Sequence, residues 1–151
     1  MEFKFNDGGR EAAGYVGKAR DCVCRSISIA SGLPYQQVYS ALAEGNSTQR
    51  KSKHSKDRPK SANNGIQVTR KWFKDYMKSI GFTWIATMTI GSGCKVHLRK
   101  NELPLGKLVV SVSKHYTAVI DGVVNDTQNP ERTTGRCVYG YWIAASSMVD
   151  C

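Results

Sequence analysis

Residues 113–126 read Ser-Lys-His-Tyr-Thr-Ala-Val-Ile-Asp-Gly-Val-Val-Asn-Asp. Asp121-Gly122 stands between two runs of apolar and β-branched residues, and this dipeptide favours a two-residue type I′ turn, so the segment predicts a β-hairpin. The register set by that turn places Asp126 diagonally across from His115 on one face, where its carboxylate can fix the tautomer of the imidazole. Asp121 itself would lie roughly 20 Å along the strand from His115, too far away to do so.

Further strands are predicted on both sides of the hairpin. Segments 82–90 and 108–112 are rich in aromatic and β-branched residues, and segment 137–143 has the pattern of a closing strand. Together with the hairpin they predict a meandering antiparallel sheet in the second half of the chain.

The first half of the chain predicts three helices. The first follows Asp21, a residue type that caps helix N-termini well, and stops at Gly32. The second begins at Pro34, which suits the first helical position, and ends at Gly45. The third carries an apolar stripe across residues 68–80. Helices followed by an antiparallel sheet predict an α+β domain.

Cys22 stands in the first turn of the first predicted helix. Peptide dipoles and unpaired N–H groups at that end favour negative charge, which lowers the pKa of a thiol and populates its nucleophilic thiolate. Cys24, two residues further on, faces roughly the opposite way and is expected to be a small buried hydrophobe. Cys22, His115 and Asp126 therefore offer a nucleophile, a base and an orienting carboxylate, the three roles of a catalytic triad.

Much of the chain resembles a group of small uncharacterised proteins of bacteriophages and bacteria, which are themselves similar to the papain-like cysteine peptidase superfamily. The resemblance extends over most of the sequence except a basic segment at 47–64. The residues that carry it are Asp21-Cys22-Val23-Cys24-Arg25, Leu33-Pro34-Tyr35, residues 93–98 and residues 115–127.

The resemblance implies a papain-like fold in which Cys22 is the nucleophile, His115 the general base and Asp126 the orienting residue. It also implies a thiol-dependent hydrolase that cleaves or transfers at an amide or isopeptide bond of a protein or peptide substrate. Papain-like enzymes usually carry a glutamine shortly before the cysteine as an oxyanion donor, and residues 14–20 contain none. Lys18 or a backbone amide would have to take that role, since losing such a donor costs about 10²–10³ in rate.

Half of the net charge of +10 lies in the segment 47–64, which carries six basic residues against a single acidic one. The segment has almost no apolar surface to bury, so we expect a mobile loop or flap. Its charge would attract nucleic acid or an acidic partner, and the alternative function is a noncatalytic nucleic-acid or host-protein binding module on a degenerate peptidase fold. The basic residues are Arg50, Lys51, Lys53, Lys56, Arg58 and Lys60.

Length and composition limit the remaining possibilities. A chain of 151 residues with 40% hydrophobic residues predicts one domain spanning 1–151. No apolar run approaches the roughly 20 residues of a membrane helix, and no export signal is evident, so we expect no membrane partner. Five cysteines without an export signal predict reduced thiols and a cytoplasmic location, the host cytoplasm if the protein is encoded by a phage.

Cys22-x-Cys24 and Cys94-x-x-His97 could together supply four ligands to zinc. A single residue between paired cysteines is fewer than structural zinc sites use, so we expect no metal and no other cofactor. His97 is instead expected to be a structural histidine. The cluster at 139–142 is expected to pack the last strand, and its exposed part could line a substrate groove.

Overall fold

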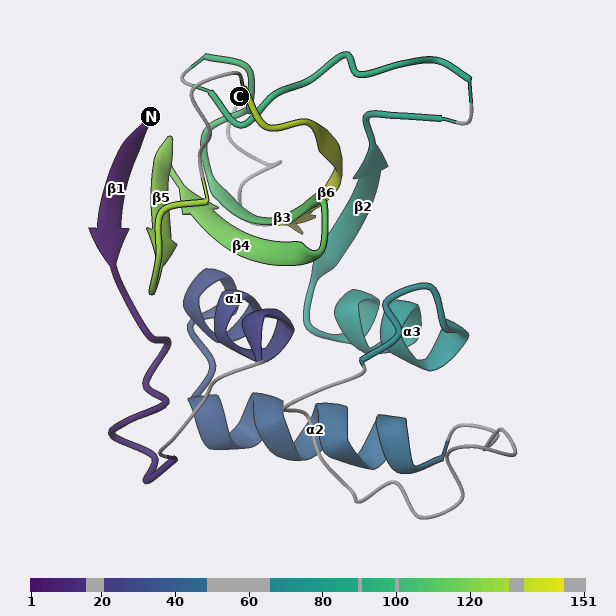
Figure 1. The fold of residues 1–151 in the computed structure, drawn as a ribbon. Helices are drawn as coiled ribbons and strands as arrows, with labels where there is room; N and C mark the ends of the chain where they lie inside the picture. Colours follow the sequence, from purple (N-terminus) through teal and green to yellow (C-terminus); the bar gives the residue numbers. More distant parts are fainter. Residues whose placement is uncertain (16–20, 49–65, 90, 100, 131–134, 146–151) are drawn as a thin grey trace.

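The computed structural model describes residues 1–15, 21–48, 66–89, 91–99, 101–130 and 135–145 (Figure 1). Within them the chain forms a mixed α+β fold, as predicted, with three helices and one six-stranded sheet. The helices are α1 (Cys22–Ser31), α2 (Tyr35–Ser47) and α3 (Lys71–Ser79). The strands are β1 (Glu2–Phe5), β2 (Phe82–Ala86), β3 (Lys107–Val112), β4 (His115–Ile120), β5 (Val123–Asp126) and β6 (Val138–Ala144).

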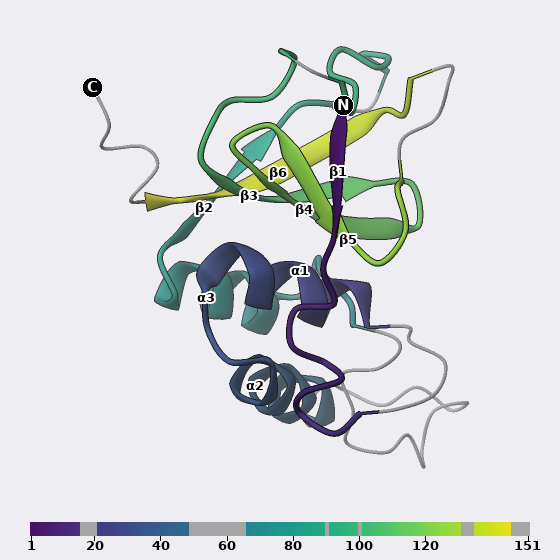
Figure 2. The ribbon, with the colours of Figure 1, turned by 90° about the vertical axis from the view of Figure 1, so that its left-hand side faces the viewer.

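The helices gather on one side of a strongly curved sheet. Figures 1 and 2 show α1 and α3 next to the strands, with α2 beneath them as a further layer. One apolar cluster joins the three helices to the strands and includes Ile27, Leu42 and Phe73. A second cluster lies on the other face of the sheet and includes Leu98, Leu108 and Val124. The packing of α1 against this sheet is what brings the N-terminus of α1 to β4.

The hairpin register predicted from Asp121-Gly122 is confirmed. Ile120 pairs with Val123 and Ala118 with Asn125 in the antiparallel ladder of β4 and β5. Both turn residues have positive φ, 48° at Asp121 and 82° at Gly122, as a type I′ turn requires. The hairpin therefore ends with its acidic residue beside the first residues of β4.

The predicted antiparallel meander is only partly correct. The strand order is β1-β5-β4-β3-β6-β2, so β6 lies between β3 and β2 instead of following them at the edge. The strand β1, which the sequence did not predict, pairs in parallel with β5 at the opposite edge. The hairpin is consequently an interior part of the sheet.

The boundaries of α2 and α3 differ from the sequence prediction, and α2 begins at Tyr35, with Pro34 as its N-cap and not as its first helical residue. The helix α1 occupies the expected residues and ends at Gly32, whose φ of 75° lies in the left-handed region. In contrast, α2 continues through Gly45 to Ser47. A Cβ atom at position 45 would stand 2.1 Å from the ring of Trp72, so this glycine gives the ring room to pack and does not stop the helix. The helix α3 begins at Lys71, later than the stripe that starts at 68.

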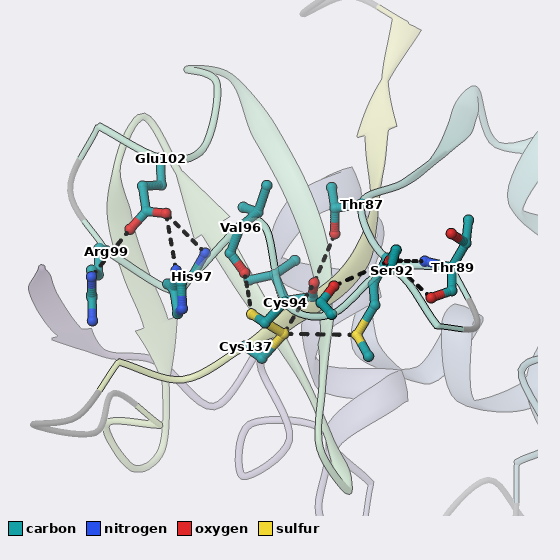
Figure 3. Close-up of a disulfide and its surroundings, with 12 residues drawn as sticks. Thr87, Thr89, Ser92, Cys94, Val96, His97, Arg99, Glu102 and Cys137 are labelled. Atoms are coloured by element: carbon teal, nitrogen blue, oxygen red, sulfur yellow. Dashed lines mark hydrogen bonds and ion pairs between the residues drawn. A yellow bond between two sulfur atoms is a disulfide. The ribbon is translucent and has the colours of Figure 1, made fainter.

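A disulfide joins Cys94 to Cys137, which lie 43 residues apart (Figure 3). The prediction that all the cysteines are reduced is therefore wrong for this pair, while Cys22 and Cys24 are free. The bond attaches the chain segment that follows β2 to the start of β6. His97, next to it, has its Nδ1 atom 3.2 Å from Oε1 of Glu102, which confirms the structural interpretation of this histidine.

No helix in the described part of the chain combines the length and the apolar character that crossing a membrane requires.

The predicted basic loop overlaps the end of α2. Ser47, its first residue, is the last residue of that helix, and Thr48 is the C-cap. Residues 49–64, with all six basic side chains of the segment, lie outside the described residues. Their proposed contact with nucleic acid or an acidic partner stays a prediction.

Candidate functional site

Cys22 is the first residue of α1 and is partly exposed. The sequence folds locally in this way because a helical apolar pattern begins directly after Asp21 and ends at Gly32. Helix geometry leaves the N–H groups of this first turn without partners inside the helix. The thiol therefore lies at the end of α1 where positive partial charge accumulates.

His115 opens β4 directly after the tight turn at Lys114, whose φ is 57°. Its Nε2 atom lies 2.7 Å from Oδ2 of Asp126, the last residue of β5. The diagonal contact expected from the hairpin register is therefore present. The Asp126 carboxylate is 4% exposed and also accepts hydrogen bonds of 2.7 Å from the Thr117 hydroxyl and from the Thr127 N–H. These donors hold the carboxylate in one orientation toward the imidazole.

The thiol of Cys22 meets the imidazole of His115. A side-chain hydrogen bond links the two groups, and the N–H of Tyr116 also donates to the sulfur. Because Asp126 engages Nε2 of His115, the remaining ring nitrogen, Nδ1, is the one that faces the thiol. The three predicted residues therefore form a continuous chain from sulfur to imidazole to carboxylate.

The charges at this chain favour a thiolate beside an imidazolium. Burial raises the pKa of the Cys22 thiol, but the hydrogen bonds from His115 and Tyr116 outweigh it, and the net pKa is lowered. Burial lowers the pKa of His115, but the hydrogen bonds to Asp126 and Cys22 raise it to about 9. Burial likewise opposes ionisation of Asp126, yet its pKa is lowered by the hydrogen bonds from His115 and Thr117. All three shifts stabilise the charged forms together.

Cys24 has the opposite environment. It is fully buried, and burial raises the pKa of its thiol to about 12, helped by the negative charge of Asp21. Its sulfur lies 3.9 Å from the carbonyl oxygen of Tyr35. The prediction that Cys24 is a buried hydrophobe is confirmed, and two thiols in one helical turn have opposite pKa shifts.

Sequence reasoning missed a buried network behind the thiol. Asp21 is 1% exposed, and its side chain does not cap α1 as predicted. It pairs with Arg25 at 2.5 Å and with Arg10 at 3.3 Å, and it accepts a hydrogen bond from the Tyr35 hydroxyl. Arg25 reaches onward to Oδ1 of Asp126 at 3.8 Å. The spacing of Asp21 and Arg25, one helical turn apart, is the sequence signal that could have revealed the ion pair.

Lys18 and a backbone amide are the two predicted replacements for the missing oxyanion glutamine, and the structure describes only the second. Lys18 lies outside the described residues. The backbone alternative remains, because the N–H groups of the first turn of α1 project from the same end of the helix as the Cys22 thiol. Such donors are what a tetrahedral oxyanion requires.

The zinc ligands considered from the sequence do not come together. Cys94 is bonded to Cys137, and no group of three or more His, Cys, Asp or Glu side chains is placed to hold a metal ion in the part of the chain that the structure describes. The functional residues that do converge are those of the thiol, imidazole and carboxylate chain.

The aromatic cluster at the start of β6 packs this strand as predicted, and its exposed part lines a groove, whose use for a substrate stays a prediction. Trp142 is buried in the helix-side apolar cluster, whereas Tyr139 is 41% exposed and lines a groove. Tyr116, whose N–H faces the Cys22 sulfur, lines the same groove.

Comparison of the chain with protein-family models, curated proteins and solved structures found no match.

Proposed function

We propose that the protein is a thiol-dependent hydrolase with a papain-like arrangement, in which Cys22 is the nucleophile, His115 the general acid and base, and Asp126 the orienting residue. The bond attacked is an amide or isopeptide bond of a protein or peptide. The observation that carries this proposal is the unbroken linkage from the Cys22 sulfur through His115 to Asp126, with Nε2 of His115 at 2.7 Å from the carboxylate.

The groups present are sufficient for both halves of the reaction. The thiolate of Cys22 adds to the carbonyl carbon, and the N–H groups of the first turn of α1 would stabilise the oxyanion. Collapse of this intermediate breaks the C–N bond while the His115 imidazolium gives its proton to the leaving amine. Neutral His115 then takes a proton from water as the water attacks the thioester, which releases the acid and restores the thiolate and imidazolium.

The papain-like part of the proposal is supported by the setting of each residue. The nucleophile begins a helix, and the histidine and the acid lie on paired antiparallel strands, in the chain order Cys, His, acid. The absence of a glutamine before Cys22 is a departure that the backbone donors would have to offset.

A cytoplasmic site of action remains a prediction. A reducing compartment would keep Cys22 free for the reaction, which favours the cytoplasm. The Cys94–Cys137 disulfide points the other way, because bonds of this kind are rare in the cytosol.

Iodoacetamide should label Cys22 in the folded protein at about pH 6, well before Cys24, because only the thiolate of Cys22 is stabilised. Peptide mapping by mass spectrometry after short labelling times measures the two rates. In the unfolded protein the two cysteines should react alike, which serves as the control. Equal rates in the folded protein, or faster labelling of Cys24, would contradict the assignment of the nucleophile.

Asp126→Asn should slow the labelling of Cys22 by about tenfold. Each unit by which the pKa of His115 falls relative to the pKa of Cys22 makes the thiolate–imidazolium pair tenfold less favourable. Asparagine keeps the shape of the side chain and an oxygen for Thr117, but it removes the charge that favours the imidazolium of His115.

Asp121→Asn is the matched control for that variant. Asp121 is exposed in the hairpin turn, where asparagine is also favoured, and its Oδ1 atom accepts a hydrogen bond of 2.9 Å from the Gly106 N–H. Labelling of Cys22 should be unchanged. A large loss in the Asp121 variant with none in the Asp126 variant would mean that Asp126 does not orient the imidazole.

A further inference from the structure

A groove of about 420 Å³ lies between α3 and the strands β2, β3, β4 and β6. In Figure 1, α3 lies directly below β2, on the helix side of the sheet. Ligand sites in proteins commonly have volumes of this order and combine apolar walls with a few polar groups. The residues that line the groove are Val68, Thr69, Lys74, Lys78, Trp84, Ser111, Tyr116, Tyr139 and Trp142.

The groove is joined to the candidate active site through Tyr116. The N–H of this residue donates to the Cys22 sulfur, and its side chain forms part of the groove wall. Cys22 itself packs against the apolar cluster that contains Tyr116 and Trp142. Tyr116 therefore contacts the thiol with its backbone and also lines the groove.

The walls of the groove present exposed aromatic surface. Trp84 is 39% exposed, and its ring packs on that of Trp142 with centroids 5.3 Å apart. Gly140 makes this arrangement possible, because a Cβ atom there would stand 2.3 Å from Cζ2 of Trp84. Tyr139 completes an open aromatic wall onto which a planar or large apolar side chain can pack.

The charge of the lining has one sign. Lys74 and Lys78 are one helical turn apart on α3 and both are exposed, and none of the described residues that line the groove is acidic. The nearby acidic residue of α3, Asp75, is paired with Lys71 at 2.7 Å and is not part of the groove. Two lysines beside an aromatic wall attract a ligand that joins an apolar group to a negative charge.

We propose that this groove binds the substrate of the candidate active site and selects a peptide segment that carries an aromatic or large aliphatic side chain next to an acidic residue. The aromatic side chain packs on Trp84 and Tyr139, and the carboxylate lies against Lys74 and Lys78. The inference rests on the proposed hydrolase function, because Tyr116 is the residue that links the groove to the thiol.

A stretch of single-stranded nucleic acid would offer the same two features, a stacking ring and a negative charge. The peptide is favoured by the position of the groove. Tyr116 links it to a thiol whose chemistry acts on carbonyl carbon, and a nucleic acid backbone contains no such bond.

The test is equilibrium binding to the Cys22→Ala protein, in which the ligand cannot be turned over. The probes are the capped tripeptides acetyl-Phe-Glu-Glu-amide, acetyl-Phe-Gln-Gln-amide and acetyl-Ala-Glu-Glu-amide, followed by titration calorimetry. We expect the first to bind at least about tenfold more tightly than either of the others, because each of these lacks one of the two groups that the groove recognises.

The charge contribution is tested by the double variant Lys74→Glu and Lys78→Glu, which should weaken binding of acetyl-Phe-Glu-Glu-amide by about tenfold or more. The double variant Lys4→Glu and Lys95→Glu changes the net charge equally at exposed positions outside the groove and should change the affinity less than about twofold. Trp84→Ala should weaken binding of both phenylalanine peptides.

Equal loss in the two lysine double variants, or no preference for the acidic aromatic peptide, overturns the proposal. So does displacement of the peptide by a short oligothymidylate that binds more tightly, which would identify the groove as a nucleic-acid site. Iodoacetamide labelling of Cys22 in the Lys74 and Lys78 variant is read separately. Unchanged labelling with lost peptide binding assigns the groove to recognition, whereas slow labelling in the parent protein would count against the proposed hydrolase itself.

Discussion

Alanine in place of Cys22 is expected to abolish the burst of p-nitrophenolate that the protein releases from p-nitrophenyl acetate. In the parent protein the thiolate takes the acetyl group as a thioester, and slow hydrolysis by water follows. Removal of the nucleophile from a triad typically lowers the catalysed rate by a factor on the order of 10⁴–10⁶, so only the background reaction should remain. Stopped-flow absorbance measures the burst amplitude, which should equal the concentration of intact Cys22.

Cys24→Ala is the matched control, two residues along the same helix. The Cys24 thiol is fully buried with its pKa raised to about 12, so its removal should leave the burst unchanged. With an amide substrate, whose leaving amine must be protonated, the rate of the parent protein should also fall as the pH rises through about 9, where His115 loses the proton that it gives to the amine. A burst that survives in the Cys22 variant and disappears in the Cys24 variant would reverse the roles of the two thiols.

The parts of the site that sequence could predict are those fixed by local rules. Asp121-Gly122 favours one turn type, the turn sets the register, and the two-residue period of a strand then brings Asp126 to His115. The helical pattern that starts after Asp21 and stops at Gly32 likewise places Cys22 at an N-terminus. None of these steps requires knowledge of a distant residue.

The parts that sequence did not predict depend on contacts between distant segments. All four residues of β1 are exposed, and no turn links this strand to β5, so its parallel pairing leaves no local pattern. Gly45 has the residue type of a helix stop, but the ring of Trp72 requires that position to be a glycine inside the helix. The Cys94–Cys137 bond similarly closes 43 residues without a recognisable motif.

Asp21 shows how a local rule can identify a position and mistake its role. An aspartate before a helix is usually a cap, and α1 does begin directly after it. The side chain turns inward instead, because Arg25 and Tyr35 offer it stronger partners in a buried environment. The residue therefore belongs to a charge network that continues through Arg25 to Asp126 in the candidate site.

Asp21→Asn should lower the free energy of unfolding by about 3–5 kcal/mol, the usual cost of removing one partner from a buried ion pair. Asparagine fits the same space, but it leaves the buried guanidinium of Arg25 without its 2.5 Å counter-charge and weakens the contact to Arg10. Urea denaturation followed by circular dichroism measures the change. The variant should unfold at a much lower urea concentration with a similar slope, because the surface exposed on unfolding is unchanged.

Asp121→Asn makes the same chemical change at an exposed turn position and should alter the free energy of unfolding by no more than about 0.5 kcal/mol. Both variants lose a carboxylate, so the difference between their free energies of unfolding measures the effect of burial and ion pairing at Asp21. If the two variants were equally stable, the network of Asp21, Arg25 and Asp126 could not be what holds the first turn of α1 against the hairpin. Cys22 and His115 would then owe their contact to the apolar packing of α1 on β4 alone.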